Sequence, residues 1–261
     1  MNRAVLFSAL RGPLFNGRMS ETQVSGVEAI LDEWQRRRLT DLRWLAYILA
    51  TAFHETGRAM QPVIETRQLS ETQNPSVDTA IARLERAWRD GKMPWVKRAY
   101  WRKDKSGLSW LGRGLPQVTH LENYAWAEEA TGIPFTKNPD LMLAMENAIP
   151  VMFIGMIEGK FTGKKLGDYF DVDTEDWFNA RRIINATESA EKVAGYAKQF
   201  HSALLTAHAA ATEVRIPPPP DIEPMPPKAP DIVLPSPGAR GNLPPTPTFW
   251  AAVKQLFSTK G

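Results

Sequence analysis

The distribution of proline divides this chain into two parts that cannot fold in the same way. Of 21 prolines in 261 residues, eight lie in residues 1–212 and thirteen lie in residues 217–247. Proline lacks a backbone N–H and has a fixed φ, so a proline-dense stretch favours an extended chain over helices and sheets. We therefore predict a folded domain over residues 1–212, a disordered proline-rich linker over residues 213–248, and a short amphipathic segment over residues 249–261.

The first 212 residues have the apolar spacing of α-helices. A capping box at Ser20 opens one helical stripe, and a second stripe runs from a cap at Thr40 or Asp41 to Gly57. Further patterns predict helices over residues 77–88, 121–130, 147–157, 173–185 and 189–211. No pair of alternating strands with a tight hairpin turn stands out, so the expected fold class is mostly α.

Composition and charge exclude several classes of protein. The chain has no cysteine, which excludes a disulfide framework, cysteine-ligated zinc and a cysteine nucleophile. Its net charge of +3 is too small to indicate nucleic-acid binding by itself. The longest apolar runs, residues 44–53 and 148–157, are shorter than the ~18–20 residues that span a bilayer. We see no export signal and expect synthesis in the cytoplasm without a signal peptide.

Two glutamates are candidates for general acid–base chemistry. Glu55 continues the apolar stripe of the second predicted helix near its C-terminus, where apolar neighbours and the helix dipole disfavour the charged carboxylate. These surroundings suit a general acid. Glu65 follows a turn in the chain, and two carboxylates ~6.5–9.5 Å apart across a cleft are typical of inverting glycosidases. The alternative interpretation is that Glu55 is a boundary residue paired with Arg58 or another arginine.

The segment over residues 110–124 is a third candidate for chemistry. Two glycines flank Arg113 and allow backbone conformations that are closed to other residues. Gln117, Thr119 and Asn123 then offer amide and hydroxyl groups of the kind that hold a sugar N-acetyl group or position a water. Each of the three is alternatively a turn or cap residue.

Taken together, these motifs resemble glycoside hydrolase family 19. Four blocks occur in the order of that family: Ala52-Phe-His-Glu-Thr-Gly57, Gly112-Arg-Gly-Leu-Pro-Gln-Val-Thr119 with Asn123-Tyr124, Asn138-Pro-Asp-Leu141, and Arg182-Ile-Ile-Asn-Ala186. The chain is more similar to the chitinase-like lysozymes, or endolysins, of phages and prophages than to plant chitinases. The resemblance covers about residues 3–205. It implies a lysozyme-like, two-lobed helical domain that cleaves β-1,4 links next to N-acetylglucosamine with inversion, without a metal or organic cofactor.

The resemblance also implies roles for individual residues. Glu55 matches the general acid of the family, Glu65 matches the general base, and Thr119 matches a residue that helps to hold the attacking water. Glu71 is the alternative general base. The chain departs from the family at Ile184-Asn-Ala-Thr187, where the family has Ile-Asn-Gly-Gly. The expected substrate-binding residues are Gln117, Asn123, Asn185, Arg182, Arg113 and Trp110.

Residues 83–113 combine ten lysines and arginines with only three acidic residues. The same segment contains four of the nine tryptophans, namely Trp88, Trp95, Trp101 and Trp110. Such a segment can bind an anionic glycan or single-stranded nucleic acid, or it can be a solvated basic surface over buried tryptophans. Because peptidoglycan is anionic and chitin is not, we favour peptidoglycan as the ligand.

The sequence thus predicts a monomeric peptidoglycan hydrolase that binds glycan strands and no nucleic acid. It would act at the cell wall, in the periplasm, after release through a membrane hole made by another protein. A chitinase and a catalytically inactive wall-binding phage component are the alternatives. The segment over residues 249–261 is expected either to anchor the chain to a membrane surface or protein partner, or to fold back on the body.

Overall fold

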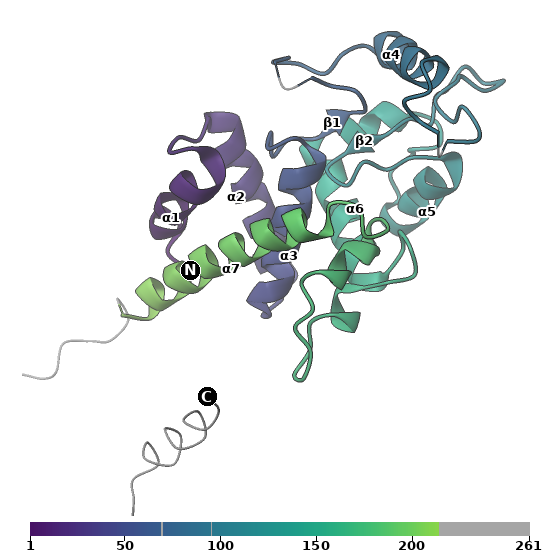
Figure 1. Cartoon of the computed structure of the whole chain (residues 1–261). Helices are drawn as coiled ribbons and strands as arrows, with labels where there is room; N and C mark the ends of the chain where they lie inside the picture. The colour runs from purple at the N-terminus through teal and green to yellow at the C-terminus, as the bar shows by residue number, and fades with distance from the viewer. Residues whose placement is uncertain (69, 95, 214–261) are drawn as a thin grey trace, which may run out of the picture. The chain divides into compact units, whose positions relative to one another are not determined.

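The computed structural model describes residues 1–68, 70–94 and 96–213. The predicted linker beyond Glu213, the predicted amphipathic segment and Trp95 lie outside the described residues. The described part is mostly helical, as the sequence predicts (Figure 1). None of its helices combines the length and the apolar character that crossing a membrane requires.

The described residues form seven α-helices, three short 3-10 helices and one small sheet. The α-helices are α1 (Arg3–Phe15), α2 (Glu21–Arg36), α3 (Leu42–Glu55), α4 (Val77–Arg89), α5 (Leu121–Thr131), α6 (Met145–Glu158) and α7 (Ala190–Glu213). The 3-10 helices are η1 (Pro139–Leu143), η2 (Leu166–Asp168) and η3 (Asn179–Ile183). The sheet consists of β1 (Val63–Ile64) and β2 (Arg113–Gly114), which pair antiparallel with Val63 opposite Gly114.

Side-chain caps fix where the two helices before the site begin. The Ser20 hydroxyl accepts from the Gln23 backbone N–H and the Gln23 side chain accepts from the Ser20 N–H, so the predicted capping box is confirmed. The Asp41 carboxylate caps α3 by accepting from the Arg43 N–H. These caps set the register that places Glu55 at the last position of α3.

The helix α1 is not among the predicted helices, although Leu6, Leu10 and Leu14 recur at helical spacing and are buried on one face. Asn2 caps this helix with its side chain. Pro13 lies inside its last turns, and a proline near the end of an apolar stripe reads as a break rather than as a helix.

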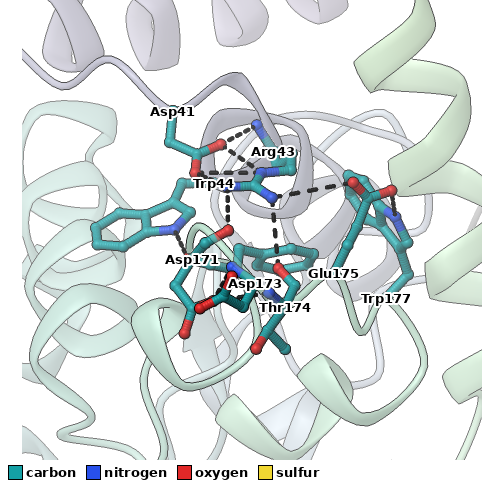
Figure 2. Close-up of polar contacts among 9 residues, drawn as sticks. Asp41, Arg43, Trp44, Asp171, Asp173, Thr174, Glu175 and Trp177 are labelled. Carbon is teal, nitrogen blue, oxygen red and sulfur yellow. Dashed lines mark hydrogen bonds and ion pairs between the residues drawn. The ribbon is translucent and has the colours of Figure 1, made fainter.

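The predicted helix over residues 173–185 is wrong. Its first part is a turn in which the Asp171 carboxylate accepts from the Asp173 and Thr174 N–H groups, and only residues 179–183 form a helix, the 3-10 helix η3. Figure 2 shows how α3 holds this turn: the Arg43 guanidinium reaches the carbonyl oxygens of Asp171 and Thr174. Contacts with a distant helix therefore override the local helical pattern.

The apolar side chains form two separate clusters. The larger cluster surrounds α3, which packs against α7, while α7 also packs against α1. The smaller cluster lies under α4 and has Ile64, Leu84, Trp101 and Leu111 among its buried members. Ile64 directly precedes Glu65, and Leu111 directly precedes Gly112. Glu65 and Gly112 therefore lie at the edge of the smaller cluster.

Candidate functional site

Glu55 lies at the C-terminal end of α3, where its carboxylate is only 16% exposed. The Arg181 guanidinium from η3 donates to Glu55 Oε1 at 2.6 Å, and this arginine side chain is 5% exposed. Arg181 is held in turn by a hydrogen bond from Nε to the Glu188 carbonyl. Glu55 Oε2 has no hydrogen-bond partner in the described part of the chain. Arg181 thus fixes the orientation of the carboxyl group through one of its two oxygens.

The arginine in contact with Glu55 is Arg181, whereas Arg182, which the sequence predicts to bind substrate, makes no hydrogen bond to Glu55 in the described part of the chain. Arg182 is exposed, and its carbonyl accepts from the Thr162 hydroxyl at 2.6 Å. In a 3-10 helix, neighbouring side chains point about 120° apart, so only one of two consecutive arginines can face α3. The alternative interpretation of Glu55 as an ion-paired glutamate thus describes a real contact, but its partner is not Arg58, whose guanidinium lies 5.6 Å from the centre of the Phe53 ring.

His54, next to Glu55, is half-buried. Burial lowers the pKa of the His54 imidazole, against the opposite effect of the nearby Glu55 carboxylate. His54 is therefore neutral at pH 7, and Arg181 is the cation in direct contact with Glu55.

Glu65 follows β1 and is held through both of its oxygens. The Tyr100 hydroxyl donates to Oε1 at 2.6 Å, and the Gly112 N–H donates to Oε2 at 2.8 Å. Burial and the Glu65 carboxylate raise the pKa of Tyr100, so its hydroxyl keeps its proton and donates. Each carboxylate oxygen has two lone pairs, so Glu65 can still accept a proton from a water. This geometry suits a general base whose orientation is fixed by neutral donors.

The fit around Glu65 is tight at Gly112. A Cβ atom there would lie 2.9 Å from Gln117 Oε1 and 3.3 Å from Glu65 Oε2. The Gln117 amide donates to the Val63 and Gly114 carbonyls, one on each strand of the small sheet. Gln117 is predicted to bind substrate. In the structure its described hydrogen bonds instead connect the two strands of the sheet next to Glu65.

The backbone around Glu65 is strained at several positions. Five non-glycine residues near it in the chain or sheet have a left-handed φ: Arg58, Met60, Thr66, Gln117 and His120. Such positions cost ~1–3 kcal/mol each and concentrate at functional sites. The buried Thr66 hydroxyl, directly after Glu65, has no hydrogen-bond partner among the described residues. Strain and an unpartnered polar group both mark this neighbourhood as more than a folding element.

Two other expected site residues lie on the segment that follows β2. The side chain of Thr119 is partly exposed and makes no hydrogen bond in the described part of the chain. The Asn123 amide donates to the Thr119 carbonyl at 2.8 Å, and its Oδ1 accepts from the Trp126 indole. Thr119 thus remains available to a water, whereas Asn123 fixes the backbone next to it.

Arg113 is a structural residue in this conformation. Its side chain is 1% exposed and pairs with Asp140 at 2.8 Å, and it also donates to the carbonyls of Ser109 and Leu111. A buried guanidinium needs such a complete set of acceptors. Arg113 therefore fixes the strand that pairs with β1 and is not free to contact a glycan.

Trp110 and Asn185 differ in their exposure. Trp110 is 8% exposed and donates from its indole to the Asp104 carboxylate at 2.9 Å. Asn185 is exposed and follows η3, the element that carries Arg181. Of these two, Asn185 is the one whose amide is open to solvent.

The carboxylate of Glu71, the alternative base, already has an ion-pair partner and a hydrogen-bond donor. Its carboxylate pairs with Arg83 at 2.6 Å and accepts from the Gln68 N–H. The hydrogen bond from Arg83 is the main reason that the pKa of Glu71 falls to about 2. Such a weak base takes little part in proton abstraction near neutral pH. The structure thus favours Glu65 over Glu71.

A cavity of about 560 Å³ lies beside Glu65 and gathers part of the basic, aromatic segment. Its lining residues include Trp88, Arg98, Tyr100, Arg102, Trp110 and His120. Tyr100 connects this cavity to the Glu65 carboxylate. Trp101 is fully buried and Trp110 is 8% exposed, so two tryptophans of the segment belong to the apolar clusters. We call this space the aromatic cavity.

Sequence reasoning misses two residues that hold the candidate acid and base, Arg181 and Tyr100. Arg181 stands beside an equally plausible arginine, and Tyr100 is 35 residues away from Glu65. The only available signal for Tyr100 is its place in the basic, aromatic segment. Neither residue follows from local spacing.

The described residues contain no cluster of three or more histidine or acidic side chains that could hold a metal ion. The chain matches no model of a known protein family, and no curated protein matches its sequence. The function is therefore argued from the site itself.

Proposed function

We propose that this protein is a glycoside hydrolase that cleaves β-1,4 bonds of bacterial peptidoglycan with inversion. Glu55 is the general acid and Glu65 is the general base. The observation that carries the proposal is the clamp on Glu65: a carboxylate held by Tyr100 and Gly112 beside a basic, aromatic cavity. The resemblance of four sequence blocks to glycoside hydrolase family 19 supports the same roles.

The proposed reaction is a single displacement. Glu55 donates its proton to the glycosidic oxygen, and the bond from this oxygen to the anomeric carbon breaks. A water attacks that carbon from the opposite face while Glu65 takes one of its protons, and Thr119 helps to hold this water. Inversion needs a carboxyl separation of ~6.5–9.5 Å to leave room for the water. Arg181 keeps the Glu55 carboxyl group in place through Oε1 and leaves Oε2 to the substrate.

A lysozyme-like, two-lobed domain belongs to the same proposal. The two separate hydrophobic clusters support it, because each lobe of such a domain needs its own core. The strands β1 and β2 border the smaller cluster, and the segments directly after β1 and before β2 carry Glu65 and Gly112. This arrangement would place the base where two lobes meet.

Peptidoglycan is favoured over chitin by the charge of the aromatic cavity. Arg98 and Arg102 line it, and so does Glu122. Arg102 is already paired with Glu85 at 2.7 Å, so Arg98 is the cation of the lining without a carboxylate partner among the described residues. Trp88, Trp110 and Tyr100 supply the aromatic part of the lining. Aromatic faces stack on sugar rings, and guanidinium groups attract the carboxylates of an anionic polymer. Chitin has no such carboxylates. We accordingly place the action of the protein at the cell wall, with glycan strands as its partner.

The test is hydrolysis of purified peptidoglycan and of chitin oligomers by the full chain and by Glu55→Gln and Glu65→Gln. Reducing ends and the anomeric form of fresh products are measured, and Glu146→Gln serves as the control because Glu146 is an acid on α6 outside the site. We expect α-anomeric products from peptidoglycan, a loss of activity of at least about 1,000-fold in each site variant, and folded variants. Glu55→Gln should also lower the melting temperature, because it leaves the buried Arg181 guanidinium without its carboxylate partner.

Three outcomes would contradict the proposal. Full activity of Glu55→Gln would show that Glu55 is not the general acid. Products from chitin oligomers alone would point to a chitinase. Binding to sedimented walls without any product would indicate an inactive wall-binding component.

A further inference from the structure

A second cavity, of about 540 Å³, lies beside the connection between Glu55 and Glu65. The N-terminal turn of α2, the loop after α3 and the segment over residues 72–74 line it. Its central residues are Gln23, Arg58, Gln61, Arg67 and Asn74, and we call it the arginine pocket. Its volume lies within the ~300–1,000 Å³ that is typical of ligand sites.

The two arginines of this pocket have no carboxylate partner among the described residues. The Arg58 guanidinium is exposed and stacks on the Phe53 ring. The Arg67 guanidinium donates to the Glu71 carbonyl, while the Glu71 carboxylate itself is paired with Arg83. Both guanidinium groups thus retain donors for a ligand, and the N-terminal end of α2 adds a partial positive charge.

The amide side chains of Gln61 and Asn74 are already engaged, in contrast to the arginines. Gln61 donates to the Thr22 carbonyl at 2.6 Å, and Asn74 donates to the Pro62 carbonyl while accepting from the Ile64 N–H. Among the charged side chains of the lining, the two guanidinium groups are thus the ones left to recognise a ligand.

Arg58 is held in place at a cost in backbone energy. Its φ is 71°, in the left-handed region that non-glycine residues avoid. The side-chain amide of Gln23, from α2, donates to the Arg58 carbonyl at 2.9 Å. The Arg58 N–H donates to the Phe53 carbonyl at 2.7 Å. Arg58 thus lies three residues after Glu55, the last residue of α3.

We propose that the arginine pocket binds carboxylates of the peptide stems that project from the glycan strands of peptidoglycan. This inference rests on the proposed function and adds a subsite that binds the peptide stem rather than the sugar. Gly57 and Arg58 line the pocket just after the candidate acid, and Val63 lines it just before the candidate base. A stem on a sugar bound between the two glutamates would start close to the pocket. Guanidinium groups bind carboxylates through paired, charge-assisted hydrogen bonds.

The kinetic test compares peptidoglycan with the same glycan strands after an amidase has removed their peptide stems. Arg58→Gln, Arg67→Gln and the double variant are measured on both substrates. We expect the double variant to raise KM at least tenfold on stem-bearing strands and to leave KM on stripped strands and kcat on both unchanged. Arg38→Gln is the matched control, because Arg38 is also an exposed arginine with a left-handed φ but lies after the other end of α2.

A binding test keeps the inference separate from the proposed reaction. Calorimetric titration of Glu55→Gln with a soluble disaccharide–tetrapeptide should show binding that weakens at least tenfold when the two arginine substitutions are added. The disaccharide without peptide should bind equally in both backgrounds. An equal loss of affinity for both ligands, or no loss of affinity for either, would overturn the peptide-stem site. Tighter binding of a phosphate polymer than of the disaccharide–tetrapeptide at the same residues would also overturn it. A wild-type chain that cleaves neither kind of strand would refute the proposed function, while the titration would still decide the pocket.

Discussion

Tyr100→Phe is the sharpest test of the clamp on Glu65. The substitution removes one hydroxyl group, which donates to Glu65 Oε1 at 2.6 Å, and keeps the ring. The ring contacts also stay, since Tyr100 packs edge-on against Trp101 at 5.1 Å and beside His120 at 4.8 Å. The perturbation is therefore confined to a single hydrogen bond.

The size of the effect follows from the charge of the acceptor. A hydrogen bond to a charged group contributes about 1.5–3 kcal/mol, and each ~1.4 kcal/mol corresponds to a tenfold change in rate. Losing the Tyr100 hydroxyl should therefore lower kcat by about 10- to 150-fold. Glu65 would remain in place through the Gly112 N–H at 2.8 Å, so activity should fall without vanishing.

The assay is the release of reducing ends from purified peptidoglycan, with the melting temperature measured in parallel. Tyr196→Phe is the matched control, because it removes the hydroxyl of a tyrosine on α7 that packs against Phe53 at 4.8 Å and makes no hydrogen bond among the described residues. We expect that control to keep full activity. Wild-type kcat in a folded Tyr100→Phe variant would refute the role assigned to the clamp.

Three further predictions concern the site and its support. Gly112→Ala should abolish most activity with a small change in melting temperature, because the new Cβ would lie 3.3 Å from Glu65 Oε2; activity near wild type would contradict the required close approach. Glu71→Gln should lower the melting temperature at pH 7. Because the pKa of Glu71 is depressed to about 2 by Arg83, this difference should shrink as pH falls from 4.5 towards 2, and a pH-independent difference would contradict the pairing. Phe53→Ala should destabilise the fold by about 3–5 kcal/mol in denaturant unfolding, since the ring is fully buried; a loss under 1 kcal/mol would contradict its place in the core.

Local sequence determined the helices and their starts. The capping box at Ser20 and the cap at Asp41 are confirmed, because a cap and the turn that it closes lie within a few residues of each other. The apolar spacing after Asp41 also places Glu55 on the last turn of its helix, and that position is confirmed. The same reasoning misses α1 and wrongly predicts a helix over residues 173–185, where Arg43 of α3 holds a turn instead.

Tertiary structure alone decided which partners hold the two glutamates. Arg181 is 126 residues from Glu55 in sequence, and Tyr100 is 35 residues from Glu65. No periodicity of 2 or 3.6 residues relates groups so far apart, since their contact depends on how helices and loops pack around the two apolar clusters. For the same reason local spacing does not show which of the consecutive residues Arg181 and Arg182 faces α3; the path of the 3-10 helix η3 decides this. The sequence thus predicts where these helices begin and end and which residue types they carry. The packing of the helices and loops decides which cation or hydrogen-bond donor contacts each glutamate.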